Sequence, residues 1–171
     1  KGDILCDVGA NVGAYSLIAA KLGIDTYSFE PSGSNYASLI RNIALNDAGL
    51  YILPIPFALS AKTGLSVFNH SDLRPGHALH SLDPESCDGI ALQQMIATVS
   101  LDDVIAWMRL APPTHLKIDV DGCELQVLKG ARKTLGVVRE ILVELTDDSE
   151  FEVMGYLAGL GFTHKFDEQA V

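Results

Sequence analysis

The sequence predicts an α/β fold with a doubly wound, mostly parallel sheet. Two observations predict it: short apolar runs alternate with stretches of helical period, and glycine-rich turns lead from a strand into a helix. Strands that alternate with helices along a chain form a parallel sheet covered on both faces. The 171 residues include 48% hydrophobic and 20% charged side chains, an ordinary globular composition. We therefore expect a single domain over 1–171.

In the first part of the chain, apolar runs and their flanking residues define the elements. Strands are expected at 4–8, 26–29 and 50–55, and helices at 15–22 and 34–45. Gly23 suits the residue that follows a helix, and Leu39 and Ile43 lie on one face of the second helix. Pro54 and Pro56 place the third strand at an edge of the sheet, or end it early.

The middle of the chain has weaker signals. Residues 58–70 are expected to form a hairpin through the turn at 62–64. Residues 69–89 show no clear period, and they hold His70, His77 and His80. We expect a long loop there, and loops of that length are often functional.

In the last part, capping residues define the helices. Strands are expected at 116–120, 140–145 and 162–166, and helices at 100–111, 124–135 and 149–160. Ser100 with Asp103 three residues later has the spacing of a capping box. Ser149 is the expected N-cap of the final helix. Gly136 and Gly161 are expected to end the last two helices.

Composition excludes several classes of partner and location. The net charge is −10, so electrostatics gives no help in reaching nucleic acid or an anionic membrane. The longest apolar run, 50–59, is too short to span a membrane and contains two prolines. Cys6, Cys87 and Cys123 form neither a disulfide framework nor a CxxC pair. We expect a cytoplasmic protein without a membrane span, and no resident metal.

The start of the chain bears on its extent. No signal peptide is visible, and an apolar strand-like run begins already at Ile4. We therefore expect a domain from a longer protein, truncated at one or both ends. The sequence does not predict an oligomeric state.

A glycine loop follows the first expected strand. It reads Asp7-Val8-Gly9-Ala10-Asn11-Val12-Gly13 and leads into a helix. Glycines allow the backbone to turn tightly and to approach a ligand, and the helix N-terminus offers free N–H groups. Glu30 follows the second strand, where a carboxylate can accept both hydroxyls of a ribose. Together these features predict an adenosine-containing cofactor; the alternative is an ordinary turn followed by a solvated Glu30.

The charges of the loop distinguish between cofactors. A dinucleotide fingerprint has glycine where Asn11 stands, because the pyrophosphate needs close approach to the backbone. Asp7 would repel a phosphate but suits a cation. S-adenosylmethionine carries a sulfonium and an ammonium group and no phosphate, so it is favoured over NAD.

Several blocks, in order along the chain, now resemble one family. They are Asp7–Gly13, Phe29-Glu30-Pro31-Ser32, Ala58-Leu59-Ser60, Leu101-Asp102-Asp103 and Lys117-Ile118-Asp119-Val120-Asp121-Gly122-Cys123-Glu124. They resemble the FkbM-type methyltransferases and cover nearly the whole chain. The resemblance implies a Rossmann-like class I methyltransferase fold and S-adenosylmethionine as cofactor. It also implies O-methylation of a sugar, a polyketide or another small-molecule or glycan acceptor.

The resemblance assigns roles residue by residue. Cofactor contacts are implied for Asp7, Gly9, Ala10, Asn11, Gly13, Glu30, Pro31, Ser32, Ala58 and Asp119. The alternative for Ala58 is a buried core position.

Methyl transfer also needs a group that orients the acceptor or takes its proton. Asp119 is the first candidate, expected to be partly buried at the end of the fourth strand of the central sheet; it would otherwise cap a turn or pair with Lys117. Glu144 and His80 are further catalytic candidates, which could instead be a solvated strand end and a polar loop residue. Asp119, Asp121 and Glu124 could bind a divalent cation. We favour the interpretation that Asp121 and Glu124 stabilise a helix N-terminus.

Two other functions compete with methyl transfer. One is an NAD-linked oxidoreductase, which Asn11 disfavours. The other is a non-catalytic cofactor-binding or scaffold domain of the same fold, which the intact acidic positions disfavour.

Overall fold

The computed structural model describes residues 2–71, 74, 76, 80–81 and 90–165. A five-stranded parallel sheet lies at its centre in the order β3-β2-β1-β8-β9. Its strands are β1 (Ile4–Val8), β2 (Asp25–Phe29), β3 (Ile52–Ile55), β8 (His115–Ile118) and β9 (Glu140–Val143). Strand order reverses between β1 and β8, which is where ligands bind in such sheets. The predicted doubly wound α/β fold is confirmed.

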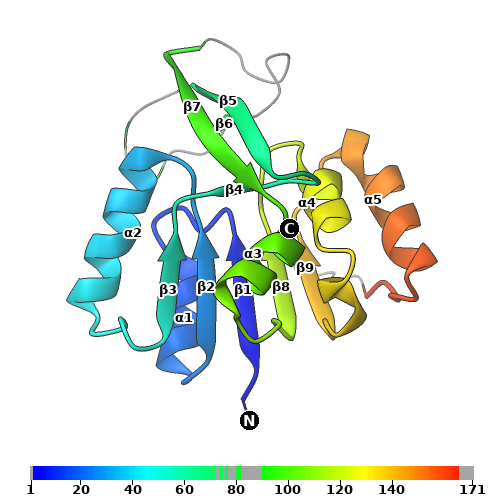
Figure 1. The fold of residues 1–171 in the computed structure, drawn as a ribbon, viewed down its shortest axis with the longest axis horizontal. Helices are drawn as coiled ribbons and strands as arrows, with labels where there is room; N and C mark the ends of the chain where they lie inside the picture. The colour runs from blue at the N-terminus through cyan, green and yellow to red at the C-terminus, as the bar shows by residue number, and fades with distance from the viewer. Residues whose placement is uncertain (1, 72–73, 75, 77–79, 82–89, 166–171) are drawn as a thin grey trace.

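The helices cover both faces of this sheet. They are α1 (Ala14–Lys21), α2 (Gly33–Leu45), α3 (Leu101–Met108), α4 (Glu124–Gly130) and α5 (Asp147–Gly159), with a 3-10 turn η2 (Thr134–Gly136) after α4. Figure 1 shows α1 behind the sheet and α3 in front of it. The main core includes Phe29, Leu101, Leu116, Ile118 and Leu128, all almost inaccessible to solvent.

A second, smaller sheet stands above the carboxyl ends of the parallel strands (Figure 1). It has the order β4-β7-β5-β6, formed by β4 (Ala58–Leu59), β7 (Leu92–Val99), β5 (Gly64–His70) and β6 (His80–Ser81). The sequence did not indicate β7. The predicted hairpin over 58–70 is wrong, because β4 and β5 do not pair with each other: β4 pairs with β7 in parallel and β5 pairs with it antiparallel.

The prediction of a loop over 69–89 is also partly wrong. Its first two residues end β5, and His70 is in register with His80 of β6. His77 and residues 82–89 lie outside the described residues.

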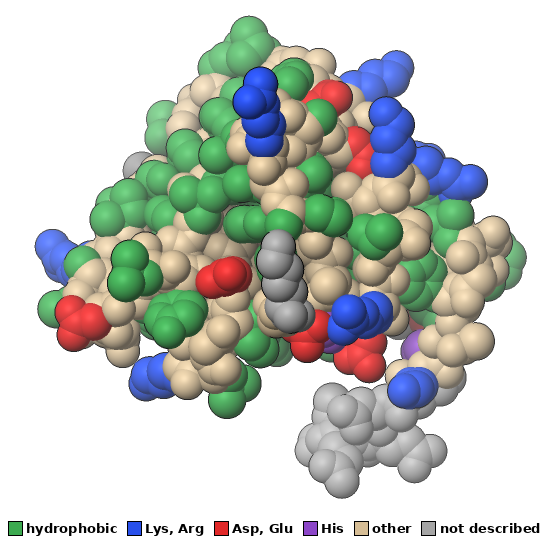
Figure 2. Space-filling model, turned by 60° about the horizontal axis from the view of Figure 1, so that its bottom comes forward, with side chains coloured by type: hydrophobic (Ala, Val, Ile, Leu, Met, Phe, Trp, Pro, Cys, Tyr) green, Lys and Arg blue, Asp and Glu red, His purple; other side chains and the backbone are tan. Residues whose placement is uncertain are grey.

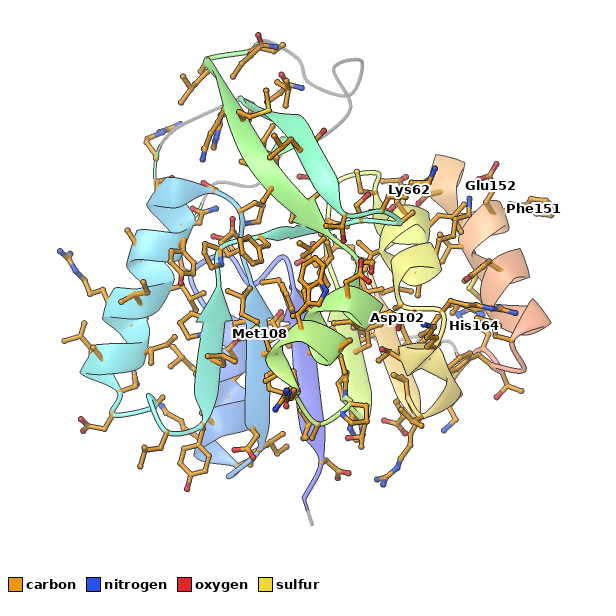
Figure 3. The ribbon with its side chains drawn as sticks, in the orientation of Figure 1. Lys62, Asp102, Met108, Phe151, Glu152 and His164 are labelled. Carbon is orange, nitrogen blue, oxygen red and sulfur yellow. The ribbon has the colours of Figure 1, made fainter. Side chains whose placement is uncertain are left out.

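The helix expected over 124–135 ends early, at Gly130. A Cβ at Gly130 would lie 2.0 Å from the carbonyl oxygen of Ser60, so the backbone here passes close to another segment. The carboxylate of Asp102 then accepts the N–H groups of Lys133 at 2.8 Å and Thr134 at 2.9 Å. Figure 3 shows Asp102 on α3, beside the chain that follows α4. This carboxylate caps η2 and gives part of the Leu101-Asp102-Asp103 block a structural role.

The predicted start of α5 is wrong, whereas the residue predicted to follow its end is confirmed. Ser149 is not the N-cap: Thr146 is, and the Ser149 hydroxyl accepts the Thr146 N–H at 3.2 Å as the third helical residue. The N-cap therefore lies three residues earlier than expected. Gly161 adopts a left-handed φ of 89° after the helix, as expected. No strand follows within the described residues 162–165, because Phe162 turns back to donate to the Leu157 carbonyl.

The end of the molecule opposite the small sheet has a mixed surface. Figure 2 shows acidic, basic and apolar side chains interspersed across that face. No helix among the described residues is long and apolar enough to cross a membrane.

Candidate active site

A cavity lies at the carboxyl ends of β1, β2 and β8, under the small sheet. Of the residues predicted from the sequence to bind cofactor, those that line it are Gly9, Asn11, Glu30, Pro31, Ala58 and Asp119. They come from three loops and from the start of β4, which are separated in the sequence. The parallel topology therefore brings together the two halves of the motif pattern, the glycine loop and the block after β8.

The backbone of the glycine loop adopts left-handed conformations that glycine and asparagine tolerate better than other residues. Gly9, Asn11 and Gly13 all adopt positive φ angles, of 73°, 52° and 95°. A Cβ at Gly9 would lie 1.9 Å from the carbonyl oxygen of Asp119, and one at Gly13 would lie 2.6 Å from Leu39 Cδ1. Gly9 thus permits the β1 and β8 loops to touch, and Gly13 permits α1 to start against α2. Asparagine tolerates the left-handed region better than most residues, which suits Asn11.

Glu30 is held rigidly at the end of β2. One carboxylate oxygen accepts the Asn11 N–H at 2.8 Å and the other accepts the Ser32 N–H at 2.8 Å. The residue is 5% exposed, yet it lines the cavity. Burial raises the pKa of Glu30 to about 7, although the two N–H donors and Lys117 act in the opposite direction. The solvated Glu30 that the sequence left open is excluded, and each oxygen keeps lone pairs for a further donor.

This raised pKa predicts a pH dependence of ligand binding. If ribose hydroxyls donate to Glu30, binding requires the ionised carboxylate, which is the minor form below about pH 7. The affinity for S-adenosylhomocysteine should then fall by about 20-fold between pH 7.5 and pH 5.5, because the ionised fraction drops about tenfold per unit below the pKa. Calorimetric titration across this range measures the effect. Glu30→Gln is the control, and an equal dependence in that variant would assign it to another group.

Asp7 lies beneath the cavity. It is fully buried, accepts the Ser16 hydroxyl at 2.6 Å and pairs with Lys117 at 3.2 Å. It is not among the residues that line the cavity. Asp7 therefore connects β1 to α1 and β8 through these two contacts.

Asp119 is more exposed than the sequence suggested. Its side chain is 47% accessible, and its carboxylate lies 3.2 Å from the Lys117 ammonium. The expectation of a partly buried carboxylate among Ile118 and Val120 is therefore wrong, because the strand has ended and the side chain points out of the core. The predicted alternative, pairing with Lys117, is what the structure shows. Asp119 also lines the cavity, so pairing does not remove it from the site.

The third acidic residue of this block, Glu124, uses its carboxylate within its own turn. The side chain turns back to accept the Gly122 N–H at 3.0 Å, just before α4. Glu124 is 3% exposed, and burial raises its pKa. Among the described residues, no group of three or more potential metal ligands comes together. The hydrogen bond to the Gly122 N–H agrees with the Glu124 part of the favoured interpretation, in which Asp121 and Glu124 stabilise a helix N-terminus.

The structure places the other described residues of the prediction outside the cavity lining. Ala10 and Ser32 are buried beside it, and Gly13 is one turn further along the loop. Glu144 follows β9, where its N–H donates to the Ile118 carbonyl and its side chain is exposed. The side chain of His80 lies outside the described residues.

Comparison with known proteins decides the family. Residues 7–166 match the family described as the Methyltransferase FkbM domain. The chain belongs to the FkbM methyltransferase family. The resemblance seen in the sequence blocks is therefore confirmed.

Relatives of this FkbM-family chain carry specific names. The hexuronic acid methyltransferase AglP of Haloferax volcanii is 29% identical over 84% of this chain and 56% of its own length. The 31-O-demethyl-FK506 methyltransferase FkbM of Streptomyces tacrolimicus is 28% identical over 95% of this chain and 73% of its own. A solved FkbM methyltransferase from Methylobacillus flagellatus has a TM-score of 0.65 and 19% identity, covering 92% of this chain and 37% of its own. The chain thus spans about half the length of AglP and less of the solved protein.

Sequence reasoning missed part of the lining of the FkbM-type cavity. The residues that it did not name as site residues are Val8, Phe29, Asn35, Phe57, Leu59, Phe68, Val120, Asp121 and Cys123. Phe57 stands directly before the predicted Ala58, so the position of the loop after β3 was a usable signal. Phe68 could not be found, because it enters through the β5–β7 pairing that the sequence did not reveal.

Proposed function

We propose that this FkbM-family chain uses S-adenosylmethionine to methylate a hydroxyl group. The observation that carries the proposal is Glu30: a rigid, buried carboxylate at the end of β2 that lines the same cavity as the glycine loop. Glu30 fits the cofactor, since its carboxylate can accept hydrogen bonds from the ribose hydroxyls. Asn11 occupies the position that a pyrophosphate needs bare, which disfavours NAD.

Different lining residues would contact different parts of the cofactor. Glu30 would hold the ribose, and Pro31 would flank the adenosine. Ala58 is small enough to leave room beside the apolar Phe57 for an adenine ring. The glycine loop would approach the methionine portion with its backbone. When bound, the cofactor supplies a methyl group on a sulfonium, activated for attack by a nucleophilic oxygen.

The chain's own contribution to transfer would be positioning and proton removal. Holding two reactants in line can be worth several kcal/mol of the barrier. Asp119 is half exposed at the cavity, so it can reach both an acceptor and water. We propose that it orients the acceptor hydroxyl and takes its proton, with Glu144 and His80 as the next candidates.

The acceptor class follows from the cavity lining and the relatives together. The charged side chains in the described lining are Glu30, Asp119 and Asp121, all acidic. Such a surface favours an acceptor whose hydroxyl groups can donate hydrogen bonds to carboxylates. Two named relatives act on a hexuronic acid and on demethylated FK506. These names support a sugar, glycan or polyketide acceptor.

Calorimetric titration tests the proposed cofactor. We expect S-adenosylhomocysteine to bind the purified chain and NAD⁺ not to bind. Binding of NAD⁺ alone would overturn the proposal in favour of an oxidoreductase. If neither ligand bound, the chain would be a domain of this fold without a working cofactor site.

Substitution of Asp119 by asparagine tests its proposed role. The amide of the Asp119→Asn variant keeps an oxygen that can orient a hydroxyl but cannot take its proton. Transfer of a radiolabelled methyl group to the acceptor found in a panel of sugars and polyketides should slow by about 100-fold, the lower end of a general-base effect. The affinity for S-adenosylhomocysteine should stay within about threefold. Full transfer by this variant would remove the role from Asp119, and Glu144 and His80 would be substituted next.

A further inference from the structure

Lys117 is a buried cation that touches three oxygen atoms of the site. Its ammonium nitrogen lies 2.9 Å from the Gly9 carbonyl oxygen, 3.2 Å from Asp7 Oδ1 and 3.2 Å from Asp119 Oδ2. Its side chain is 6% exposed. An ammonium group has three N–H donors and no acceptor. Its contact with the Gly9 carbonyl is a hydrogen bond, and its contacts with the two carboxylates are ion pairs.

The three oxygen partners differ in how far they depend on the positive charge of Lys117. Asp7 is fully buried and also accepts the Ser16 hydroxyl, so its charge depends on Lys117 for compensation. Asp119 is half exposed, and water can replace the ammonium there. The Gly9 carbonyl belongs to the loop that lines the cavity. A lysine that served only as the counter-ion of Asp7 would not need contacts with the Gly9 carbonyl and the Asp119 carboxylate.

The contact between Lys117 and Gly9 links β8 to the glycine loop, next to the point where strand order reverses. The N–H of Gly9 donates to the Phe29 carbonyl at the end of β2, at 3.0 Å. Its carbonyl is bound from the other side by Lys117, which belongs to β8. Gly9 is therefore held between β2 and β8 by hydrogen bonds on both sides.

We propose that Lys117 is a positioning residue: its ammonium fixes the glycine loop and the Asp119 carboxylate relative to each other, and so prepares the cavity for the cofactor. This inference rests on the proposed function, because the cofactor is the group for which the loops are prepared. It assigns no contact between Lys117 and cofactor. The competing role is purely structural, as the counter-ion of Asp7.

The test separates these two roles by removing both buried charges. Lys117→Met alone would leave Asp7 buried without its counter-ion, which can unfold a protein. The informative comparison is Asp7→Asn against the double variant Asp7→Asn/Lys117→Met, in which no charge is stranded. Thermal unfolding verifies that both variants fold. Calorimetry with S-adenosylhomocysteine then measures the affinity of each.

We expect the double variant to unfold cooperatively, with a Tm close to that of Asp7→Asn. It should nevertheless bind S-adenosylhomocysteine about tenfold more weakly than Asp7→Asn, the loss typical of one hydrogen bond from a charged group. Asp7→Asn/Lys117→Arg, which keeps the positive charge and the donors, should recover most of that affinity.

Equal affinity in Asp7→Asn and the folded double variant would overturn the positioning role and leave Lys117 a counter-ion. An arginine variant that bound no better than the methionine variant would also count against it. If the parent chain failed to bind S-adenosylhomocysteine, the proposed function would fall and this inference with it. The parent titration therefore distinguishes the two failures.

Discussion

Replacing Glu30 by alanine is expected to weaken the binding of S-adenosylhomocysteine by more than about 100-fold. Two ribose hydroxyls would donate to this carboxylate, and a hydrogen bond to a charged group contributes about 1.5–3 kcal/mol. The substitution also frees the N–H groups of Asn11 and Ser32, which the carboxylate now holds at 2.8 Å. The loops on both sides of the cofactor would lose an anchor. Calorimetric titration at pH 8, where Glu30 of the parent is ionised, measures the full effect.

Asp121→Asn provides a matched control for this loss of charge. Asp121 also lines the cavity, but it is exposed and lies on the β8 side. Its replacement should change the affinity by less than about threefold, because an exposed charge is screened by solvent. If Glu30→Ala bound as tightly as the parent, the ribose would not be held at β2 and the proposed orientation of the cofactor would be wrong.

The parts of the fold that were predictable depend on local signals. The glycine loop and Glu30 were visible because a strand, its turn residues and the following helix are contiguous, and Pro54 and Pro56 indicated the edge position of β3. The cap by Ser100 was visible for the same reason: its hydroxyl accepts the Asp103 N–H three residues on, at 3.1 Å. The parallel order of the strands then brought distant loops together at one edge without any further information from the sequence.

What could not be predicted depends on pairings between distant segments. The strand at Leu92–Val99 has no strict alternation, and both of its neighbours in the sheet lie more than twenty residues earlier in the chain. Asp102 stood out only as part of a family block, and its task of capping η2 follows from contacts about thirty residues away. Lys117 was considered only as a partner of Asp119. Its contacts with Gly9 and Asp7 exist because β1 and β8 are neighbours.

Replacing Gly9 by alanine is expected to lower the free energy of unfolding by about 3 kcal/mol or more. Two separate costs contribute. The left-handed backbone at φ 73° costs an L-residue about 1–2 kcal/mol, and overpacking adds about 1–3 kcal/mol. The overpacking is severe because the new Cβ would lie 1.9 Å from a backbone oxygen, that of Asp119, which cannot rotate away as a side chain could. Urea unfolding followed by circular dichroism measures the change.

Gly23→Ala separates the two costs. Gly23 has nearly the same φ, 76°, but a Cβ there would meet nothing within 4 Å. It should lose only the conformational part, about 1–2 kcal/mol. The difference between the two variants measures how closely the β1 loop approaches the β8 loop. An equal loss in both would mean that the loops separate readily. Gly9 would then be needed for its backbone conformation alone, and the contact that joins the glycine loop to Asp119 would have no part in shaping the cavity.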